Sequence, residues 1–470
     1  MDRALILTTS GVFERTPEHG RPSPLTMVAG LSLFQRTLLT MQRAGISHFM
    51  ILAGDLAPSL REQLQGDRRL IAEVRWLPIR EFPPTDPRTW EILSVMMGGG
   101  YLVAGTGAIF STELITRLRE EARARTPVLV MRRGLVEKQA SAIRLHRQRS
   151  DDGVLMVEAP VTTTPEPSSG PMLDLVAIPE GFPTTGWASP EDSPDSPDSP
   201  HPLQSALERS LRDGQVTMIA LGEEWYEDVR ASGDASIADA ESVAHAERTL
   251  EQSLKGPPLS GLEGFVDRYF NRKCSRWLTR WLLPTPLTPN AVTLFATAVG
   301  FVAAGAFAVG GYVAAIVGAL LFQFSAILDC CDGEVARLKF LESPFGQQLD
   351  LILDNVVHIA IFAGIAWGVS HSTWGSWALL FGGLAIVGNI AAFAVVQAAM
   401  RIRTHMDESR RARIDAIFNS LVSRDFSVVV LVFALINQMQ WFLVLAAIGS
   451  NVFWPFLAWQ LRPPRPVQKQ

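Results

Sequence analysis

Hydrophobic and polar positions alternate with short periods in the first third of the chain. Residues 32–45 and 111–124 carry apolar positions every three or four residues, which is typical of amphipathic helices. Short apolar runs typical of buried strands occupy residues 4–9, 48–54, 74–79, 101–105 and 127–131. This alternation of strands and helices predicts an α/β domain with a mostly parallel sheet covered by helices.

Long uncharged stretches replace this pattern in the last third of the chain. Residues 290–328 contain no charged side chain, and as one helix they would extend about 58 Å, roughly twice the hydrocarbon thickness of a bilayer. We therefore expect a hairpin of two spans that turns at a Gly-Gly pair. Residues 351–400 and 426–461 each predict a further pair of spans. The pattern thus predicts an all-α integral membrane domain with six transmembrane helices over residues 286–462.

Composition changes twice between these two parts. Residues 158–202 are rich in Pro, Ser, Thr and Asp and end in SPEDSPDSPDSPHP, a composition that cannot bury a core. We expect them to form a disordered insert in a first domain of residues 1–250, because QVTMIAL (215–221) is typical of another strand. Residues 259–285 mix basic and aromatic residues at helical spacing and predict an amphipathic juxtamembrane helix. Residues 463–470 are then a cytoplasmic tail.

Net charge, cysteine count and the N-terminal residues argue against three classes of protein. The chain of 470 residues has a formal net charge of −5, so nothing suggests a nucleic-acid partner. Its three cysteines (Cys274, Cys330 and Cys331) do not make a disulfide framework, and two of them are adjacent. The N-terminal residues MDRALILTTSG have an acid at position 2 and only a short apolar run, which does not indicate a signal peptide.

Four aspartates stand at the edges of these apolar stretches, where charges are costly unless something compensates them. Asp329 and Asp332 are three residues apart, and Asp350 and Asp354 are four apart, so each pair lies on one face of its helix. Two such helices side by side would bring four carboxylates together. A loop of solvated acids is the simpler interpretation of a charge cluster. A divalent cation such as Mg²⁺, Mn²⁺ or Ca²⁺ would remove the repulsion in a converged site.

The spacing around these aspartates resembles a known signature. The chain matches every specified position of D-x-x-D-G-x-x-A-R, eight residues, G-x-x-x-D-x-x-x-D, the motif of the CDP-alcohol phosphatidyltransferase family. The resemblance implies a metal-dependent enzyme that moves a phosphoalcohol from a CDP-alcohol to an alcohol acceptor and releases CMP. It also implies a lipid bilayer as partner, and it is compatible with a homodimer.

The resemblance assigns roles to the motif residues. One or two Mg²⁺ or Mn²⁺ ions would be held by Asp329, Asp332, Asp350 and Asp354, and Asp354 would also be the base that takes the acceptor's proton. The nucleotide-binding residues would be Asp329, Asp332, Gly333, Ala336, Arg337 and Gly346. The donor would be CDP-diacylglycerol or CDP-inositol.

A second anion site is suggested by two arginines after the fourth expected span. Arg401 and Arg403 stand where relatives that use phosphorylated acceptors have Arg-x-Arg. A phosphate pocket there would make inositol phosphate or glycerol phosphate the acceptor. The alternative is that both arginines serve membrane topology, since that too predicts basic residues at this place.

Basic residues are confined to one set of the connections between the expected spans. The turns near residues 310, 373 and 438 contain neither Lys nor Arg. The other connections and the C-terminal tail carry Arg337, Lys339, Arg401, Arg403, Arg410, Arg411, Arg413, Arg424, Arg462, Arg465 and Lys469. The positive-inside rule therefore predicts an inner (cytoplasmic) membrane protein with both termini and the aspartates on the cytoplasmic side.

The first domain resembles nucleotidyltransferases of the sugar-1-phosphate type, through ALILTTSGVFER and SPLTMVAGLSLFQRTLLTMQRAGI. It departs from them at the positions of a lysine and of metal-binding aspartates. Ser23 stands in place of their lysine, Arg230 in place of an aspartate, and VAGTGAIF lacks their metal-binding aspartate. We therefore expect a degenerate, inactive domain. The order of the two domains resembles the bifunctional inositol-1-phosphate cytidylyltransferase/di-myo-inositol-phosphate-phosphate synthase enzymes.

Two other functions remain open at this point. An active cytidylyltransferase in residues 1–250 would make the CDP-alcohol that the membrane domain consumes. A non-catalytic membrane protein or transporter is the third possibility, against which the complete motif argues.

Overall fold

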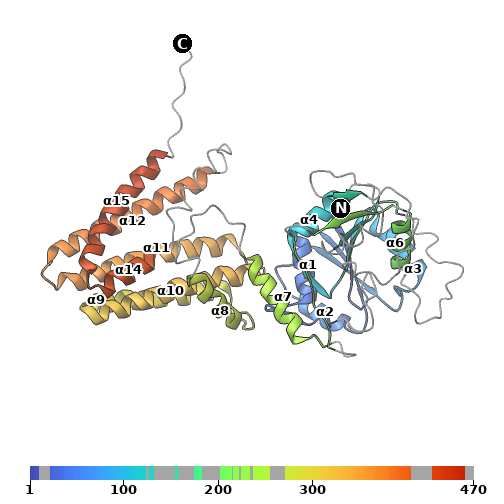
Figure 1. Ribbon diagram of the computed structural model, residues 1–470, viewed down its shortest axis with the longest axis horizontal. Coiled ribbons are helices and arrows are strands. Elements are labelled where there is room, and N and C mark those ends of the chain that lie inside the picture. The colour runs from blue at the N-terminus through green and yellow to red at the C-terminus, as the bar shows by residue number, and fades with distance from the viewer. Residues whose placement is uncertain are drawn as a thin grey trace, which may run out of the picture. The chain divides into compact units, whose positions relative to one another are not determined.

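The computed structural model describes residues 1–9, 22–122, 126–131, 154–156, 174–182, 202–213, 215–221, 224–232, 237–254, 270–403 and 426–460. The chain divides into two compact units, Met1–Leu250 and Glu251–Gln470. Each unit has a hydrophobic core of its own. In the described residues, strands occur in the first unit and the second unit is helical (Figure 1).

One large sheet forms the centre of the first unit, with described strands in the order β5-β4-β1-β6-β10-β8-β11-β9. They are β1 (Arg3–Leu7), β4 (His48–Ala53), β5 (Glu73–Pro78), β6 (Tyr101–Gly105), β8 (Val128–Met131), β9 (Val154–Met156), β10 (Leu175–Ile178) and β11 (Thr217–Ala220). β1 pairs in parallel with β4 and β6, as do β4 with β5 and β8 with β11. β10 is antiparallel to β6 and β8, and β9 to β11. The predicted mostly parallel α/β architecture is confirmed.

Helices cover both faces of this sheet (Figure 1). One face carries α1 (Leu33–Arg43), α2 (Ala57–Leu64) and α4 (Thr112–Glu121), and the other carries α3 (Pro87–Met97) and α6 (Pro202–Arg212). Alternate residues of β1 supply the two cores, because successive side chains of a strand point to opposite faces. Ala4 and Ile6 pack in the core with α1, whereas Leu5 and Leu7 pack in the core with α3.

The structure corrects the expected insert of residues 158–202. Within this range it describes residues 174–182, where Leu175–Ile178 form the fully buried strand β10 between β6 and β8. The prediction of disorder is therefore wrong for this strand, and the rest of the range up to residue 201 lies outside the described residues. Four consecutive apolar residues suffice for a buried strand, but a composition averaged over the whole range hides them.

A buried arginine supports a small hairpin, β2 (Met27–Val28) and β3 (Leu31–Ser32), whose turn residues Ala29 and Gly30 have φ angles of 49° and 78°. Arg36 is 3% exposed and donates from Nη2 to the carbonyl oxygens of Val28 at 2.9 Å and Ala29 at 3.2 Å. Burial lowers the pKa of Arg36 to about 10, against an opposing contribution from Glu247. The guanidinium therefore stays charged at neutral pH and holds the hairpin in place.

Long apolar helices make up the second unit. They are α9 (Pro289–Val309), α10 (Tyr312–Leu338), α11 (Pro344–Ser370), α12 (Ser376–Arg403), α14 (Phe426–Leu435) and α15 (Met439–Gln460). The first turn falls at the predicted Gly-Gly pair, Gly310 and Gly311, which have φ angles of 77° and 84°. A positive φ angle is open to glycine at little cost, so this pair permits a sharp reversal between α9 and α10.

The number of spans differs from the prediction of six. Among the described residues, five helices are long and apolar enough to cross a membrane: α9, α10, α11, α12 and α15. The described part of α14 has 10 residues, which extend only about 15 Å and cannot cross the hydrocarbon layer alone. Residues 404–425 before it lie outside the described residues. The helices identify an integral membrane unit with five candidate spans.

Close packing of α9 against α11 depends on small residues. A Cβ built on Gly364 would lie 2.2 Å from the carbonyl oxygen of Ala304, and one on Gly368 would lie 2.1 Å from that of Phe307. Neither contact can be relieved by moving a flexible side chain, because the opposing atoms are backbone. Helices that approach this closely through glycine gain van der Waals contact that larger residues would prevent. This close packing holds α9 and α11 together.

We predict that Gly364→Ala destabilises the membrane unit, because its methyl group must push α11 away from α9, at a cost on the order of 1–3 kcal/mol. Gly305→Ala is the matched control on α9, since a Cβ there meets nothing within 4 Å. A thiol-reactive dye can follow unfolding of this unit during heating, because Cys330 and Cys331 are buried. Gly364→Ala should react at a lower temperature, and equal curves for the two variants would contradict the packing argument.

Candidate active site

The aspartate motif is divided between two helices of the membrane unit. Asp329 and Asp332 lie in the last third of α10, and Asp350 and Asp354 lie in the first half of α11. The connection is short because Ser343 caps α11, its Oγ accepting from Gly346 N at 3.0 Å, and Pro344 follows as the first helical residue. The chain therefore reverses directly after α10 and returns the second pair of aspartates toward the first.

Three of the four predicted ligands converge. One carboxylate oxygen each from Asp329, Asp332 and Asp350 lies within 4.8 Å of the other two. Asp329 and Asp332 are only 8% and 6% exposed. Carboxylates held this closely with little water repel one another strongly, whereas a divalent cation with oxygen preference is stabilised by the same arrangement. The donor set therefore fits a hard divalent metal ion.

Asp354 lies outside this three-residue cluster among the described residues, one helical turn after Asp350 on the same face of α11. Its part in binding metal therefore stays a prediction. His358, one turn further, makes edge contacts with the rings of Phe322 at 5.9 Å and Phe426 at 5.2 Å. These contacts fit a histidine packed between helices.

A threonine that the sequence did not single out supports the cluster. Thr293 of α9 is 5% exposed, and its Oγ1 donates to Oδ2 of Asp332. The helix α9 begins at Pro289 after the cap Thr288, whose hydroxyl accepts from Ala291 N at 3.3 Å. A polar residue one turn inside an apolar helix was the signal that could have identified Thr293. The site is thus built from three helices.

The remaining motif residues surround the cluster on the helix ends. Arg337 is exposed, and its guanidinium lies over Gly333, with Nη1 3.5 Å from where a Cβ would stand. A Cβ on Gly346 would lie 3.1 Å from Oδ1 of Asn290 and 3.0 Å from Oγ of Ser343. Gly346 thus permits α11 to start close to α9. Ala336, half-buried, follows on α10.

Glu334, within the motif but not specified by it, faces away from the aspartates. It is 6% exposed and accepts from Ser275 Oγ at 2.8 Å and Thr279 Oγ1 at 2.7 Å. Both hydroxyls belong to α8 (Arg272–Leu282). Side chains two positions apart on a helix point about 200° apart, which explains why Asp332 and Glu334 lie on opposite faces of α10.

The predicted acceptor site is not assembled by the described residues. Arg401 is exposed in the last turn of α12, Arg403 is the last residue of that helix, and residues 404–425 after it lie outside the described residues. The arginines therefore stay a prediction.

In the first unit, two segments that are predicted from the sequence to lack metal-binding aspartates lie side by side. β7 (Ala108–Phe110) pairs with β12 (Tyr226–Asp228), which places Asp228 opposite Ala108. Val229 N also donates to the carbonyl oxygen of Gly107 at 3.0 Å, and Arg230, which follows, is exposed. The segment of residues 107–110 thus lies beside the segment of residues 226–229, which leads directly to Arg230.

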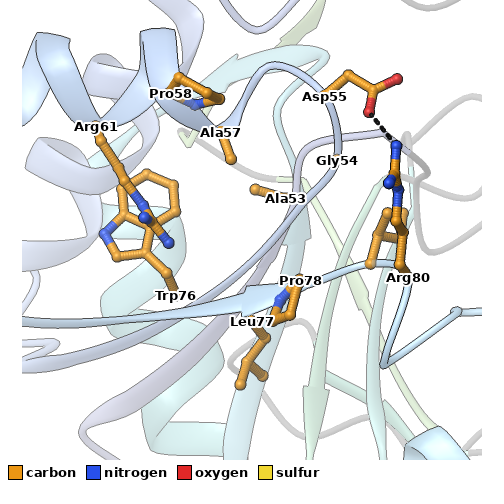
Figure 2. A pocket seen from close by; sticks show the side chains of 11 residues that line it. Ala53, Gly54, Asp55, Ala57, Pro58, Arg61, Trp76, Leu77, Pro78 and Arg80 are labelled. Atoms are coloured by element: carbon orange, nitrogen blue, oxygen red, sulfur yellow. Dashed lines mark ion pairs between the residues drawn. The ribbon is translucent and has the colours of Figure 1, made fainter.

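A shallow pocket of about 310 Å³ lies elsewhere in this unit, at the ends of β4 and β5 (Figure 2). Arg61 stacks over the ring of Trp76 at 5.2 Å, and Arg80 forms a 3.6 Å ion pair with Asp55. Both partners of that pair are almost fully exposed, so the pair adds little stability. The pocket contains none of the predicted site residues.

Comparisons with known proteins bear on both units. Residues 286–453 match the family described as CDP-alcohol phosphatidyltransferase. A Rubrobacter xylanophilus protein named bifunctional IPC transferase and DIPP synthase is 28% identical over 373 residues, covering 76% of each chain. An Aquifex aeolicus protein of the same name is 22% identical over 353 residues, covering 75% of this chain and 73% of that one.

Two further matches cover smaller parts of this chain. The phosphatidylinositol phosphate synthase of Mycobacteroides abscessus is 33% identical over 119 residues, which are 25% of this chain and 53% of that protein. The solved structure of the inositol-1-phosphate CTP transferase from T. maritima covers 53% of this chain and 96% of its own at 10% identity, with a TM-score of 0.33. The family match, by contrast, includes every aspartate of the motif together with Thr293. Residues 286–453, which hold the aspartate cluster, are therefore similar to the CDP-alcohol phosphatidyltransferase family.

Proposed function

We propose that this protein transfers a phosphoalcohol from a CDP-alcohol to the phosphorylated alcohol inositol phosphate, and releases CMP. The observation that carries the proposal is the convergence of Asp329, Asp332 and Asp350 from two helices within a complete family motif. The relatives with matches in both units are named for IPC transferase and DIPP synthase activity, which favours CDP-inositol as donor. CDP-diacylglycerol as donor, or glycerol phosphate as acceptor, is the alternative within the same reaction class.

The metal would be Mg²⁺ or Mn²⁺, as one or two ions held by Asp329, Asp332, Asp350 and Asp354. Bound there, it would neutralise charge on the donor's diphosphate and on the departing CMP. Arg337 is placed to contact a phosphate oxygen, because its guanidinium projects beside the cluster over Gly333. Thr293 keeps the carboxylate of Asp332 in one orientation.

The reaction then needs one proton transfer by the protein. The carboxylate of Asp354 accepts the proton of the acceptor's hydroxyl group as its oxygen attacks the phosphorus next to the transferred alcohol. The bond from that phosphorus to the CMP oxygen breaks, and CMP leaves with the bonding electrons. The burial of Asp329 and Asp332 keeps bulk water from competing as a nucleophile.

We also propose that the membrane unit has six spans, with α14 extended by residues before it, and that the aspartates and both termini face the cytoplasm. The arginines and lysines of the connections support this orientation. We further propose a homodimer in the inner membrane, which chemical cross-linking in native membranes would test.

The first prediction from this proposal concerns the metal ligands. Asp329→Asn, Asp332→Asn and Asp350→Asn should each lower the rate of CMP release by roughly a hundredfold or more, because each removes a charge that stabilises the metal. Glu342→Gln is the control, since Glu342 is an exposed acid of the connection between α10 and α11. Chelation of divalent ions should abolish CMP release and added Mn²⁺ should restore it. Near-normal activity of any aspartate variant would remove that residue from the site.

The second prediction concerns the acceptor. Converting Arg401 and Arg403 together to Gln should raise the KM for inositol phosphate about tenfold to a hundredfold per lost contact, while the KM for the CDP-alcohol changes little. The split between the two substrates is the measurement, because lower expression cannot produce it. Equal changes in the KM for both substrates would show that the two arginines do not bind the acceptor and serve only membrane topology.

The third prediction concerns the first unit. We propose that residues 1–250 do not transfer nucleotides, because Ser23 and Arg230 stand where a lysine and an aspartate are expected. In addition, Asp228 lies opposite Ala108, in the segment that lacks the expected metal-binding aspartate. The full-length protein, incubated with CTP and inositol phosphate, should form no CDP-inositol, even in the Asp329→Asn background that cannot consume it. Accumulation of CDP-inositol there would establish the bifunctional alternative.

A further inference from the structure

The helix α8 presents its polar side to the protein. Asn271, Ser275 and Thr279 recur at intervals of four residues, so they form one stripe along the helix. They are 0%, 0% and 1% exposed, which makes them among the most buried polar residues of the described chain. In a water-soluble helical protein such a stripe would normally be apolar.

This polar stripe is held against α10 by side-chain hydrogen bonds. Both oxygens of Glu334 accept from Ser275 and Thr279 at 2.8 and 2.7 Å, and Gln323 Nε2 donates to Asn271 Oδ1 at 2.5 Å. Removing the hydroxyl groups would leave a buried carboxylate without compensation, which is strongly unfavourable. The rotation of α8 about its own axis is therefore fixed, and with it the direction of its other faces.

The opposite face of α8 is aromatic and exposed, and Phe270, two residues before the helix, extends it. Phe270, Trp277 and Trp281 are 52%, 63% and 67% exposed, and at about 100° per residue they lie 200–240° from Ser275. The rings of Trp277 and Trp281 contact each other edge-on at 6.2 Å. Large aromatic side chains gathered on one exposed face indicate a surface that another apolar phase covers.

Basic side chains lie along one edge of this aromatic face. Lys273, Arg276 and Arg280 fall between the polar stripe and the aromatic face, about 100–160° from Ser275. Arg280 binds Glu251 through a 2.6 Å ion pair, whereas Lys273 is exposed. Tryptophan next to lysine and arginine is the composition found where a helix lies at the boundary between lipid tails and headgroups.

The neighbouring surface identifies what covers the aromatic face. α9 starts only a short turn after α8 and exposes Leu294, Phe295 and Val302 at 55%, 57% and 60%. As a candidate span, α9 must present these residues to lipid tails. The aromatic face of α8 is thus joined by a short connection to a surface that needs a bilayer.

We propose that the exposed face of α8 is a docking surface for anionic phospholipid. Phe270, Trp277 and Trp281 enter the boundary between acyl chains and headgroups, and Lys273 and Arg276 bind the phosphate groups of these lipids. This surface is separate from the aspartate cluster, since α8 contacts the face of α10 that carries Glu334. A test of lipid binding at this surface is therefore independent of a test of the reaction proposed above.

A nitroxide label tests the aromatic part of this surface. The full-length protein with Cys274→Ser and Trp277→Cys, reconstituted in vesicles of phosphatidylcholine and phosphatidylglycerol, is labelled at position 277, because Cys330 and Cys331 are buried. Cys274→Ser alone measures any background labelling. We expect collisions of the label with oxygen, which concentrates in lipid, to exceed those with a water-soluble nickel chelate. Lys273→Cys in the same background is the matched control and should show relatively more contact with the chelate.

Either of two other results would overturn the proposal. A label at position 277 that meets the nickel chelate as readily as the label at 273 would show that the aromatic face is in water. A label shielded from both reagents would show that protein covers this face.

A second measurement tests the lipid class. Spin-labelled phosphatidylglycerol should associate with the wild-type protein in preference to spin-labelled phosphatidylcholine. Lys273→Gln with Arg276→Gln should reduce this preference by up to about fivefold for each charge removed. Arg61→Gln with Arg80→Gln, two exposed arginines of the first unit, is the control for the loss of charge alone. An unchanged preference in the α8 variant would show that these side chains do not bind the headgroups.

Discussion

Electrostatic repulsion among Asp329, Asp332 and Asp350 is the constraint on which the rest of the membrane unit depends. Their oxygens approach within 4.8 Å where little water reaches them, so the surrounding helices must supply the energy that holds them together. α9 does this by packing through glycine against α11 and by donating Thr293 to Asp332. A metal ion bound there would couple its own binding to the assembly of this end of the helices, since it would stabilise only the assembled arrangement.

Much of this site could be predicted because its spacing is regular. Helical periodicity places Asp329 with Asp332, and a short connection is enough to bring Asp350 back to them. Thr293 and Glu334 could not be predicted in the same way, since their partners lie on other helices and depend on how those helices pack. The strand β10 was missed for a different reason, because its four apolar residues lie within a segment whose average composition is polar.

The architecture of the first unit depends on contacts that do not involve the side chains of Ser23 and Arg230. β7 pairs with β12, and Arg36 holds the β2–β3 hairpin through its carbonyl oxygens. These contacts are made mainly by backbone atoms and by apolar cores on both faces of the sheet. Neither the side chain of Ser23 nor that of Arg230 belongs to these contacts, so the sheet does not depend on which residues stand there. Architecture in this unit is therefore no evidence of activity.

Two residues of α10 that are only two positions apart make contacts on opposite faces of the helix. Asp332 points to the cluster and Glu334 to α8, and a helix is too stiff to bend appreciably between neighbouring turns. Any tilt imposed on one face must therefore appear at the other. If α8 follows the level of the headgroups, a thicker or thinner bilayer would turn α10 and change the separation of the aspartates. The rate of the enzyme would then report the physical state of the membrane in which it works.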